Sequence, residues 1–265
     1  MPLKLAWATD IHLNFAPPAQ VEAFVAELGQ GDAVLLTGDL AEATDVEAWL
    51  VRLADRLRRP LWFVLGNHDY YGGRIPEVRA RITALCQDHP HLRWLPAAGV
   101  VHLSDKAALV GHDGWGDARN GDFMKTPVRL NDHVWIDGLN DLPRAELRRR
   151  LQALGDESAA HLRAVLPAAL AQYPAVIVAT HVPPFVESCW HEGRTSTWEW
   201  TADFSNQAAG AALLEMADAF PDREILVLCG HTHGHGEATL RPNLRVWTGG
   251  AEYGEPALQR LIEVA

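Results

Sequence analysis

Five short apolar runs in this 265-residue chain each end on a side chain that can bind a metal ion. The runs end in the sequences AWATDIH, LLTGDL, FVLGNHD, VATHVPP and VLCGHTH. The first three alternate with patterns that predict helices near residues 18–28, 44–57 and 74–88. This βαβαβ order predicts a sheet covered by helices and restricts the chain to an α/β fold.

The rest of the chain continues the alternation of strands and helices. Residues 100–113 contain the runs VVHLS and AALVGHD, which predict a hairpin or adjacent antiparallel strands, and therefore a mixed sheet. A helix is expected over residues 143–172, with a break at Gly155. Another helix is expected near residues 206–219, and further strands in AVIVATHVPP, EILVLCGHTH, LRVWTGG and ALQRLIEV.

A single domain spanning residues 1–265 is expected, because a chain of this length with 48% hydrophobic residues can bury a substantial core. Two irregular segments, near 113–142 and 185–205, are too long for ordinary connections. Loops of this length are usually functional or disordered, and we expect these two to be lid-like.

Charge and cysteine content restrict the partners and the compartment. The formal net charge of −11 argues against nonspecific binding to a nucleic acid polymer or to an anionic membrane. Cys86, Cys189 and Cys229 form no CxxC pair, so neither a disulfide framework nor a thiolate zinc site is predicted. The first residues, MPLKLAWATD, contain no basic leader and no long apolar stretch. A cytoplasmic location is therefore expected, and the oligomeric state stays open.

The strand ends supply a set of oxygen and imidazole ligands without any thiolate. Ligand sites of open α/β sheets form outside the carboxyl ends of strands, so these turns are expected to converge. Such ligands suit manganese, iron, zinc, nickel or cobalt. The set exceeds what one tetrahedral zinc takes, which indicates two metal ions sharing one carboxylate, with Asp39 as the natural bridge. Its members are Asp10, His12, Asp39, Asn67, His181, His231 and His233.

Local geometry supports this convergence. Asp10 and His12 are two residues apart and would reach the same ion if the strand geometry continued through the turn. Gly38, Gly66 and Gly230 would let the backbone turn sharply and would leave room for the ligands.

The ordered set of D10-I-H12, G38-D39-L-A-E42, G66-N67-H68-D69, H181 and G230-H231-T-H233 resembles the five-block signature of the calcineurin-like metallophosphoesterase superfamily. The resemblance implies a four-layer α/β/β/α sandwich of two mixed sheets, with a dinuclear metal centre at the strand ends. It further implies that one metal takes Asp10, His12, Asp39 and His233, and the other Asp39, Asn67, His181 and His231. Glu42 departs from the signature, which often has aspartate there, but this residue is usually no direct ligand.

The resemblance implies hydrolysis of phosphate esters, with a metal-bridging hydroxide attacking phosphorus. Two metal ions supply the nucleophile and neutralise the phosphoryl oxygens, but the departing alkoxide also needs a proton. His68 lies beside a ligand and is expected to provide this proton, while Asp69 would accept the imidazole N–H. The alternative is that His68 caps the turn and Asp69 caps the following helix.

The motifs also restrict the substrate. GDLAEA and GNHDYYGG lack the arginines and the GNHE sequence usual in the protein Ser/Thr phosphatases of the superfamily. The pyrophosphatases of lipid A synthesis usually have arginine at the position of His68. The chain looks more like the group of the class III cyclic nucleotide phosphodiesterases, although Thr180 replaces the first histidine of their HHPP sequence. A small-molecule phosphodiester, with nucleotides as candidates, is therefore preferred over a phosphomonoester, a phosphoprotein or a noncatalytic binding role.

The irregular segments are the expected source of substrate selectivity. Their aromatic and basic side chains either stack on a substrate ring and pair with phosphate, or fix the segments onto the domain. These side chains are Trp115, Trp135, Trp190, Trp198, Trp200, Phe123, His191, Arg119 and Arg194. His112, Asp113 and His235 either support the site or, more commonly for such residues, are solvated loop positions.

Overall fold

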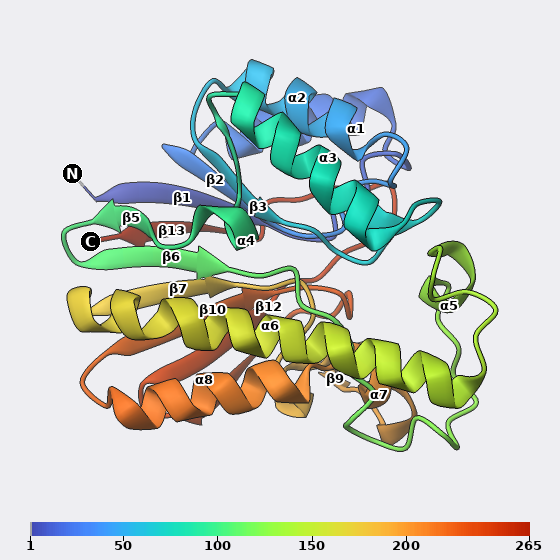
Figure 1. Ribbon diagram of the computed structural model, residues 1–265. Helices are drawn as coiled ribbons and strands as arrows, with labels where there is room; N and C mark the ends of the chain where they lie inside the picture. Colours follow the sequence, from blue (N-terminus) through green and yellow to red (C-terminus); the bar gives the residue numbers. More distant parts are fainter. Residues whose placement is uncertain (1) are drawn as a thin grey trace.

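The computed structural model describes residues 2–265 and contains two mixed β-sheets packed face to face, with helices on both outer faces (Figure 1). The expected four-layer α/β/β/α sandwich is confirmed. Within residues 2–265, no helix combines the length and the apolar character needed to cross a membrane.

The first sheet is built from the N-terminal half of the chain and the last strand. Its order is β13 (Arg260–Val264), β1 (Leu3–Ala8), β2 (Ala33–Thr37), β3 (Leu61–Val64) and β4 (Leu92–Trp94). The strands β1 to β4 are parallel, whereas β13 is antiparallel to β1. Its outer face is covered by α1 (Pro18–Leu28), α2 (Val46–Leu57) and α3 (Ile75–Asp88), which confirms the three helices expected there.

The second sheet has four parallel strands between two antiparallel edge strands. Its order is β11 (Gly236–Arg241), β12 (Leu244–Thr248), β10 (Glu224–Cys229), β7 (Ala175–Ala179), β6 (Ala107–Gly111) and β5 (Val101–Ser104). Helices α6 (Arg144–Gln172) and α8 (Gln207–Ala219) cover its outer face. The pairing of β5 with β6 confirms the hairpin expected over residues 100–113.

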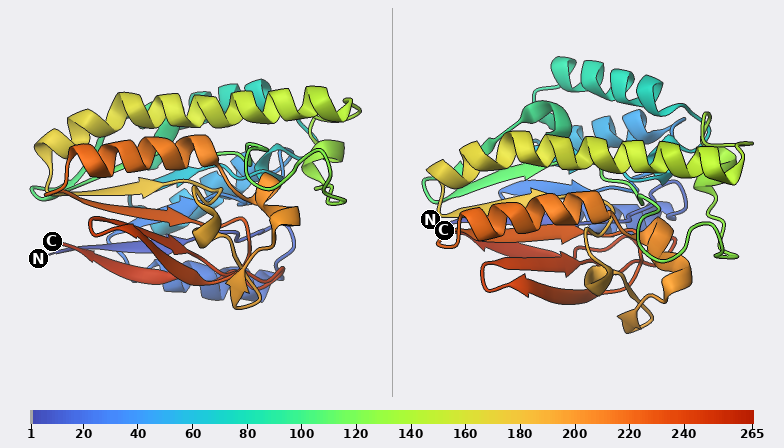
Figure 2. Two further views of the ribbon diagram at one scale, coloured as in Figure 1. Left: turned by 90° about the horizontal axis from the view of Figure 1, so that it is seen from below. Right: turned by 60° about the horizontal axis from the view of Figure 1, so that its bottom comes forward.

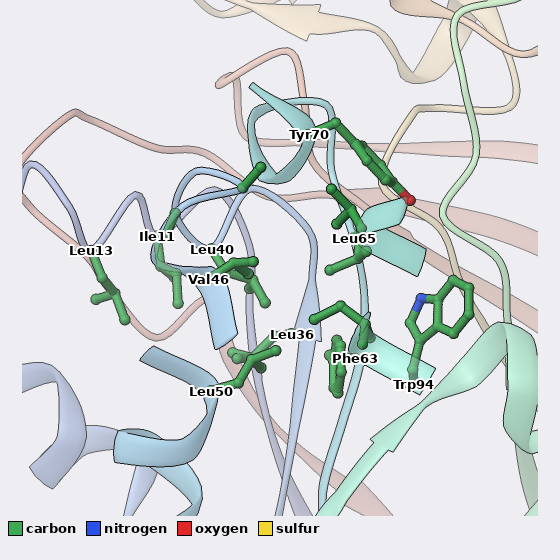
Figure 3. Packing of buried hydrophobic residues seen from close by; sticks show 14 of the residues in the cluster. Ile11, Leu13, Leu36, Leu40, Val46, Leu50, Phe63, Leu65, Tyr70 and Trp94 are labelled. Carbon is green, nitrogen blue, oxygen red and sulfur yellow. The ribbon is translucent and has the colours of Figure 1, made fainter. Parts of the chain in front are cut away.

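Alternating side chains of the strands fill three separate layers of core. In β1, Leu5 and Trp7 face the second sheet, whereas Ala6 and Ala8 face the helices. This alternation follows from the two-residue period of a strand. Figure 3 shows the layer on the helix side, where Leu36 of β2 packs near Leu50 of α2. Because both faces of the central strands are buried, strands such as β2 and β3 are continuous apolar runs.

Helix α6 corrects one expectation. It runs from Arg144 to Gln172 without the break expected at Gly155. A Cβ atom at Gly155 would lie 2.4 Å from the Cβ of Asp117, so this glycine provides room for a close approach of the segment 113–142. Tertiary packing, and not termination of the helix, explains the residue.

Short elements cluster at one end of the sandwich. The segments 113–142 and 185–205 contain α5 (Asp132–Trp135), α7 (Trp198–Phe204) and the two-stranded ribbon β8 (Trp190–His191) and β9 (Arg194–Thr195). They lie at the end where β1 and β6 point, away from the C-terminus (Figure 2). The remaining short helices are η1 (His68–Tyr70), α4 (Leu95–Ala98) and η2 (Val186–Ser188).

Asp113 joins the two sheets at this end and is not the solvated loop residue that was expected. Its side chain is buried, and its Oδ1 accepts hydrogen bonds from the Leu65 backbone N–H and from Trp94 Nε1, both at 2.8 Å. Its Oδ2 accepts one from the Tyr70 hydroxyl at 2.7 Å. The neighbouring His112 is buried too, so the carboxyl end of β6 is fixed against the ends of β3 and β4.

Candidate metal centre

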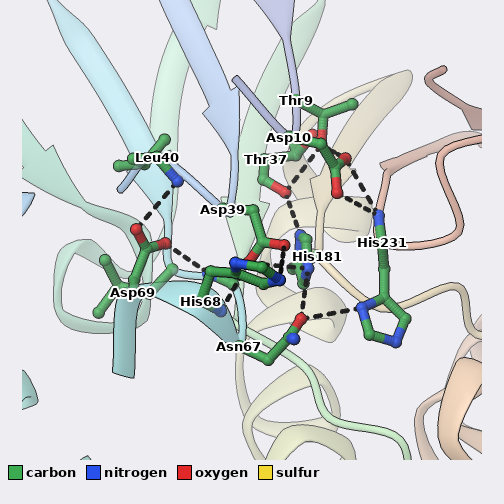
Figure 4. A network of polar contacts seen from close by, with 12 residues as sticks. Thr9, Asp10, Thr37, Asp39, Leu40, Asn67, His68, Asp69, His181 and His231 are labelled. Atoms are coloured by element: carbon green, nitrogen blue, oxygen red, sulfur yellow. Dashed lines mark hydrogen bonds and ion pairs between the residues drawn. The ribbon is translucent and has the colours of Figure 1, made fainter. Parts of the chain in front are cut away.

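All the predicted ligands lie together beyond the carboxyl ends of five strands, and Figure 4 shows most of them. The turns after β1, β2, β3, β7 and β10 provide them, as the arrangement of open α/β sheets predicts. They are, in chain order, Asp10, His12, Asp39, Asn67, His181, His231 and His233. Six of the seven are buried, and His233 is partly exposed.

One half of the centre consists of Asp10, His12, Asp39 and His233. A ligand atom of each lies within 4.8 Å of the corresponding atoms of the other three. The Nε2 atoms of His12 and His233 are 3.3 Å apart, and His233 Nε2 is 3.5 Å from Asp10 Oδ1. His12 Nε2 is 3.8 Å from Asp39 Oδ2. Two carboxylates and two imidazoles thus face one point.

The other half is built around the amide oxygen of Asn67. Asn67 Oδ1 lies 3.0 Å from His181 Nε2 and 2.9 Å from His231 Nδ1. His181 Nε2 is also 3.4 Å from Asp39 Oδ1. The two oxygens of Asp39 therefore face different halves, which is the geometry that a bridging carboxylate needs.

Hydrogen bonds behind the ligands show that this donor set fits a cation. His181 Nδ1 lies 2.9 Å from the Thr37 carbonyl oxygen, and His231 Nε2 lies 3.2 Å from that of Asp203. A carbonyl only accepts, so these nitrogens carry hydrogens, and the other ring nitrogen of the neutral His231 presents a lone pair. That lone pair faces the oxygen of Asn67, which is also an acceptor. Acceptors about 3 Å apart repel one another unless a positive charge lies between them.

Burial keeps two of the histidines neutral. It lowers the pKa of His12 and of His231 to about 3, so near pH 7 each ring has a free lone pair. At His181 burial also lowers the pKa, but the nearby carboxylate of Asp39 outweighs burial and raises the pKa to about 10. A metal ion at this position would replace that proton, because imidazole binds metals in its neutral form.

Five of the predicted ligands have left-handed backbone conformations. Their φ angles are 50° for Asp10, 38° for His12, 53° for Asp39, 70° for His231 and 58° for His233. The condition that strand geometry continues through DIH is therefore not met, because β1 ends at Ala8. Asp10 and His12 reach the same point through a strained turn. Such conformations are uncommon for residues with a Cβ atom and concentrate at functional sites.

The glycines beside the ligands have the expected effect. Gly38 has a φ of 93°, which favours glycine. Gly66 and Gly230 provide space, because a Cβ atom would lie 2.2 Å from Asp39 Oδ1 in the first case and 1.9 Å from Asp10 Oδ2 in the second. Any larger residue would displace a ligand carboxylate.

Asp69 does not have the expected contact with the His68 ring. Its Oδ1 accepts hydrogen bonds from the backbone N–H groups of Leu40 and Ala41, and its Oδ2 accepts one from Gly66 (Figure 4). Burial, followed by the charge of Asp39, raises the pKa of Asp69 to about 8. Asp69 thus holds the turns after β2 and β3 against each other. Its contacts are structural, which corrects the orienting role expected for it.

His68 lies directly over the centre. Its backbone N–H donates to Asp39 Oδ1 at 2.8 Å, and its ring Nε2 is 3.9 Å from Asp39 Oδ2. The ring packs between Tyr71 and His12, with centroid distances of 4.3 and 4.6 Å. Within residues 2–265, its buried Nδ1 atom has no hydrogen-bond partner. The imidazole is therefore fixed by ring packing, with its Nε2 edge toward the open side.

A pocket of about 240 Å³ opens over the centre. Its aromatic walls are Tyr71, Phe204 and Tyr253, none of which the sequence predicts as a site residue. Of the selected lid residues, His191 lines the pocket, whereas Trp115 and Phe123 are buried in the core on the helix side of the first sheet. No arginine or lysine of the described chain belongs to its lining. Arg119 forms ion pairs with Asp117 and Asp156, which supports the alternative that it fixes its segment onto the domain.

The two irregular segments contact the Asn67 half of the centre. The buried Asp132 of α5 accepts hydrogen bonds from Asn67 Nδ2 at 2.8 Å and from the Tyr71 hydroxyl at 2.7 Å. His133 Nε2 lies 3.3 Å from Asp203 Oδ1 of α7, whose carbonyl oxygen faces His231. Contacts from α5 and α7 thus set the orientation of two ligands.

Replacing Asp132 with alanine is expected to weaken metal binding at the Asn67 half about 10- to 100-fold, since the Asn67 amide would lose its anchor. Metal content measured after dialysis against a range of free Mn²⁺ concentrations would show this. Asp137→Ala is the matched control, because Asp137 is an exposed aspartate of the same segment. Unchanged binding of both ions in Asp132→Ala would contradict the assigned contact.

The chain is similar to one protein family and to several solved structures. The family model for calcineurin-like phosphoesterases matches residues 3–235. No curated protein matches the chain. Among solved structures, the chain is similar to the phosphopantetheinyl hydrolase PptH from Mycobacterium tuberculosis, with 15% identity, a TM-score of 0.67, and coverage of 97% of this chain and 95% of that one.

Two further structures share the fold. A dimetal phosphatase from Danio rerio has 11% identity and a TM-score of 0.58, with coverage of 94% of this chain and 88% of the other. GAP50, the anchor in the inner membrane complex of Plasmodium, has 14% identity and a TM-score of 0.52, with coverage of 94% and 71%. At these identities the likeness concerns the fold.

Proposed function

Because the chain belongs to the calcineurin-like phosphoesterase family, we propose that it hydrolyses a small-molecule phosphodiester at a centre of two metal ions held by the seven clustered side chains. The observation that carries this proposal is the convergence of lone pairs on two neighbouring points, with Asp39 between them. Manganese, iron, zinc, nickel and cobalt all suit these ligands, and their availability would decide which are bound.

The residues around the centre have separate roles in the proposed reaction. When bound, two such ions supply a nucleophile from water at neutral pH and neutralise the phosphoryl oxygens. Asp39 holds both halves at a fixed spacing. His68 Nε2 faces the open side of the pocket and donates the proton that the departing alkoxide requires. Tyr71 and His12 keep that ring in place.

The pocket favours a diester over a monoester. A diester carries one negative charge, whereas a monoester carries up to two near neutral pH, and the lining contains no arginine or lysine of the described chain to balance the second. Tyr71, Phe204 and Tyr253 offer apolar and π surfaces to a neutral substituent such as a nucleoside base. These features support a small organic diester, with nucleotides among the candidates.

Metal removal tests the proposal. Treatment with a chelator followed by dialysis is expected to abolish hydrolysis of bis-p-nitrophenyl phosphate, and added Mn²⁺ is expected to restore it. The rate on p-nitrophenyl phosphate, measured in parallel, is expected to be lower. A phosphopantetheinyl ester is a further test substrate, because one solved structure of this fold is a phosphopantetheinyl hydrolase. Faster turnover of the monoester would refute the diester preference.

A noncatalytic binding role is the second candidate, since one protein of this fold is an anchor. The clustered ligands and the position of His68 support catalysis instead. A protein that binds no metal and hydrolyses neither ester after Mn²⁺ addition would favour the binding role.

A further inference from the structure

Tyr253 belongs to a loop outside the residues that the family model matches, between β12 and β13. The base of this loop is closed by Gln259, whose side chain donates to the Gly250 carbonyl oxygen at 2.8 Å and accepts from the Gly250 N–H at 3.1 Å. The Ala251 N–H donates to the His233 carbonyl oxygen at 3.2 Å. The loop is thereby tied to the turn that carries His231 and His233.

This anchoring places the Tyr253 side chain over the metal centre. Its ring centroid lies 4.5 Å from that of His12 and 5.2 Å from that of His233, and Phe15 packs edge-on against it. The residue is 53% exposed and lines the pocket, so one face of the ring covers ligands and the other faces solvent.

The hydroxyl of Tyr253 lies 3.4 Å from His68 Nε2. Asp69, the expected partner of the His68 ring, is instead bonded to three backbone N–H groups. Within the described residues, Nδ1 of His68 has no hydrogen-bond partner, and the Asp39 carboxylate is 3.9 Å from Nε2. The tyrosine is thus the polar neighbour in hydrogen-bond range of the ring nitrogen that faces the pocket.

We propose that Tyr253 is a positioning residue that holds His68 Nε2 toward the leaving-group oxygen. The inference rests on the proposed function. A phenol both accepts and donates hydrogen bonds, so it can share the hydrogen of a protonated Nε2 with the leaving-group oxygen and can donate to the bare nitrogen afterwards. As the bond from phosphorus to the leaving oxygen breaks, the His68 proton passes to that oxygen, and the hydroxyl of Tyr253 then donates to the emptied nitrogen. The ring keeps one orientation throughout.

Tyr253→Phe tests the inference, because it removes the hydroxyl and keeps the ring on His12. Two diesters separate proton donation from other effects. Bis-p-nitrophenyl phosphate releases a stable phenolate, whereas 2′,3′-cyclic adenosine monophosphate releases an alkoxide that needs a proton. The variant is expected to lose about tenfold in kcat on the cyclic nucleotide, which is the effect of one hydrogen bond, and less than about twofold on the aryl ester. Its metal content is expected to equal that of the wild type.

Tyr173→Phe is the matched control, since the Tyr173 hydroxyl lies 3.2 Å from His102 Nδ1 on the second sheet, outside the pocket lining. It is expected to retain wild-type kcat on both esters. The double variant of His68→Ala with Tyr253→Phe is expected to be no slower than His68→Ala alone, because residues that act through one another are not additive.

The outcomes separate this inference from the proposed function. An active wild type, with Tyr253→Phe equal to it on both esters or equally slowed on both, overturns the positioning role. Additive losses in the double variant overturn it as well. A wild type that binds Mn²⁺ but hydrolyses neither ester overturns the proposed function, and this inference with it.

Discussion

Replacing Asp39 with asparagine is expected to lower kcat/KM for bis-p-nitrophenyl phosphate by at least about 1000-fold, or about 4 kcal/mol of transition-state stabilisation. The carboxylate has one oxygen near His181 and the other near His12, so both halves of the centre depend on its charge. An amide offers one oxygen and one nitrogen that carries hydrogens, and cannot bind two cations in this way. Metal content is expected to fall below two ions per chain.

Asparagine is the informative substitution because it leaves the backbone undisturbed. Asp39 has a φ of 53°, and asparagine tolerates this region about as well as aspartate does. The control is Asp141→Asn, since Asp141 has the same φ of 53° and is exposed. Steady-state kinetics and elemental analysis of both variants would give the result. Two bound ions and full activity in Asp39→Asn would exclude a bridging role.

His68→Ala is expected to keep both metal ions and to lose about 100- to 10,000-fold in turnover of esters with poor leaving groups. The Nε2 atom of His68 faces the pocket, and the His68 ring belongs to neither of the two clusters of ligand atoms. The loss on p-nitrophenyl esters is expected to be much smaller, because nitrophenolate departs without a proton. A plot of log kcat against leaving-group pKa would therefore become steeper.

His235→Ala is the control for this experiment. His235 is an exposed histidine two residues after a ligand, and it does not line the pocket. It is expected to retain the kinetics of the wild type. Equal slopes for His68→Ala and the wild type would remove His68 from proton transfer, and loss of metal would instead identify it as part of the ligand set.

The sequence predicted the central strands well because burial on both faces leaves a clear pattern. Every residue of β2 (Ala33–Thr37) is buried, so its apolar run is continuous. The edge strand β11 has partly exposed residues and only a weak pattern, and β4 has three residues, so neither was predicted. The break expected at Gly155 failed because a glycine in a helix can serve packing by a distant segment.

The candidate ligands could be selected from the sequence for a related reason, because all lie within a few residues of the end of an apolar run. The residues that orient them could not. Asp132 is 65 residues from Asn67, and Tyr253 is 185 residues from His68. Neither has a local sequence pattern, because tertiary contacts alone bring them to the centre. The contact assumed between His68 and Asp69 failed for the opposite reason, since neighbours in the chain point to different sides of a tight turn.

The left-handed turns that carry five of the proposed ligands lower the thermal stability of the fold and at the same time serve its proposed activity. Each such residue costs about 1–3 kcal/mol relative to a relaxed backbone, and glycine would remove much of that cost. Glycine would also remove the side chain that the turn places at the metal centre. If this chain evolved under selection for thermal stability alone, without selection for its activity, substitutions at the metal centre would be expected to accumulate first. The sheets and helices would be retained.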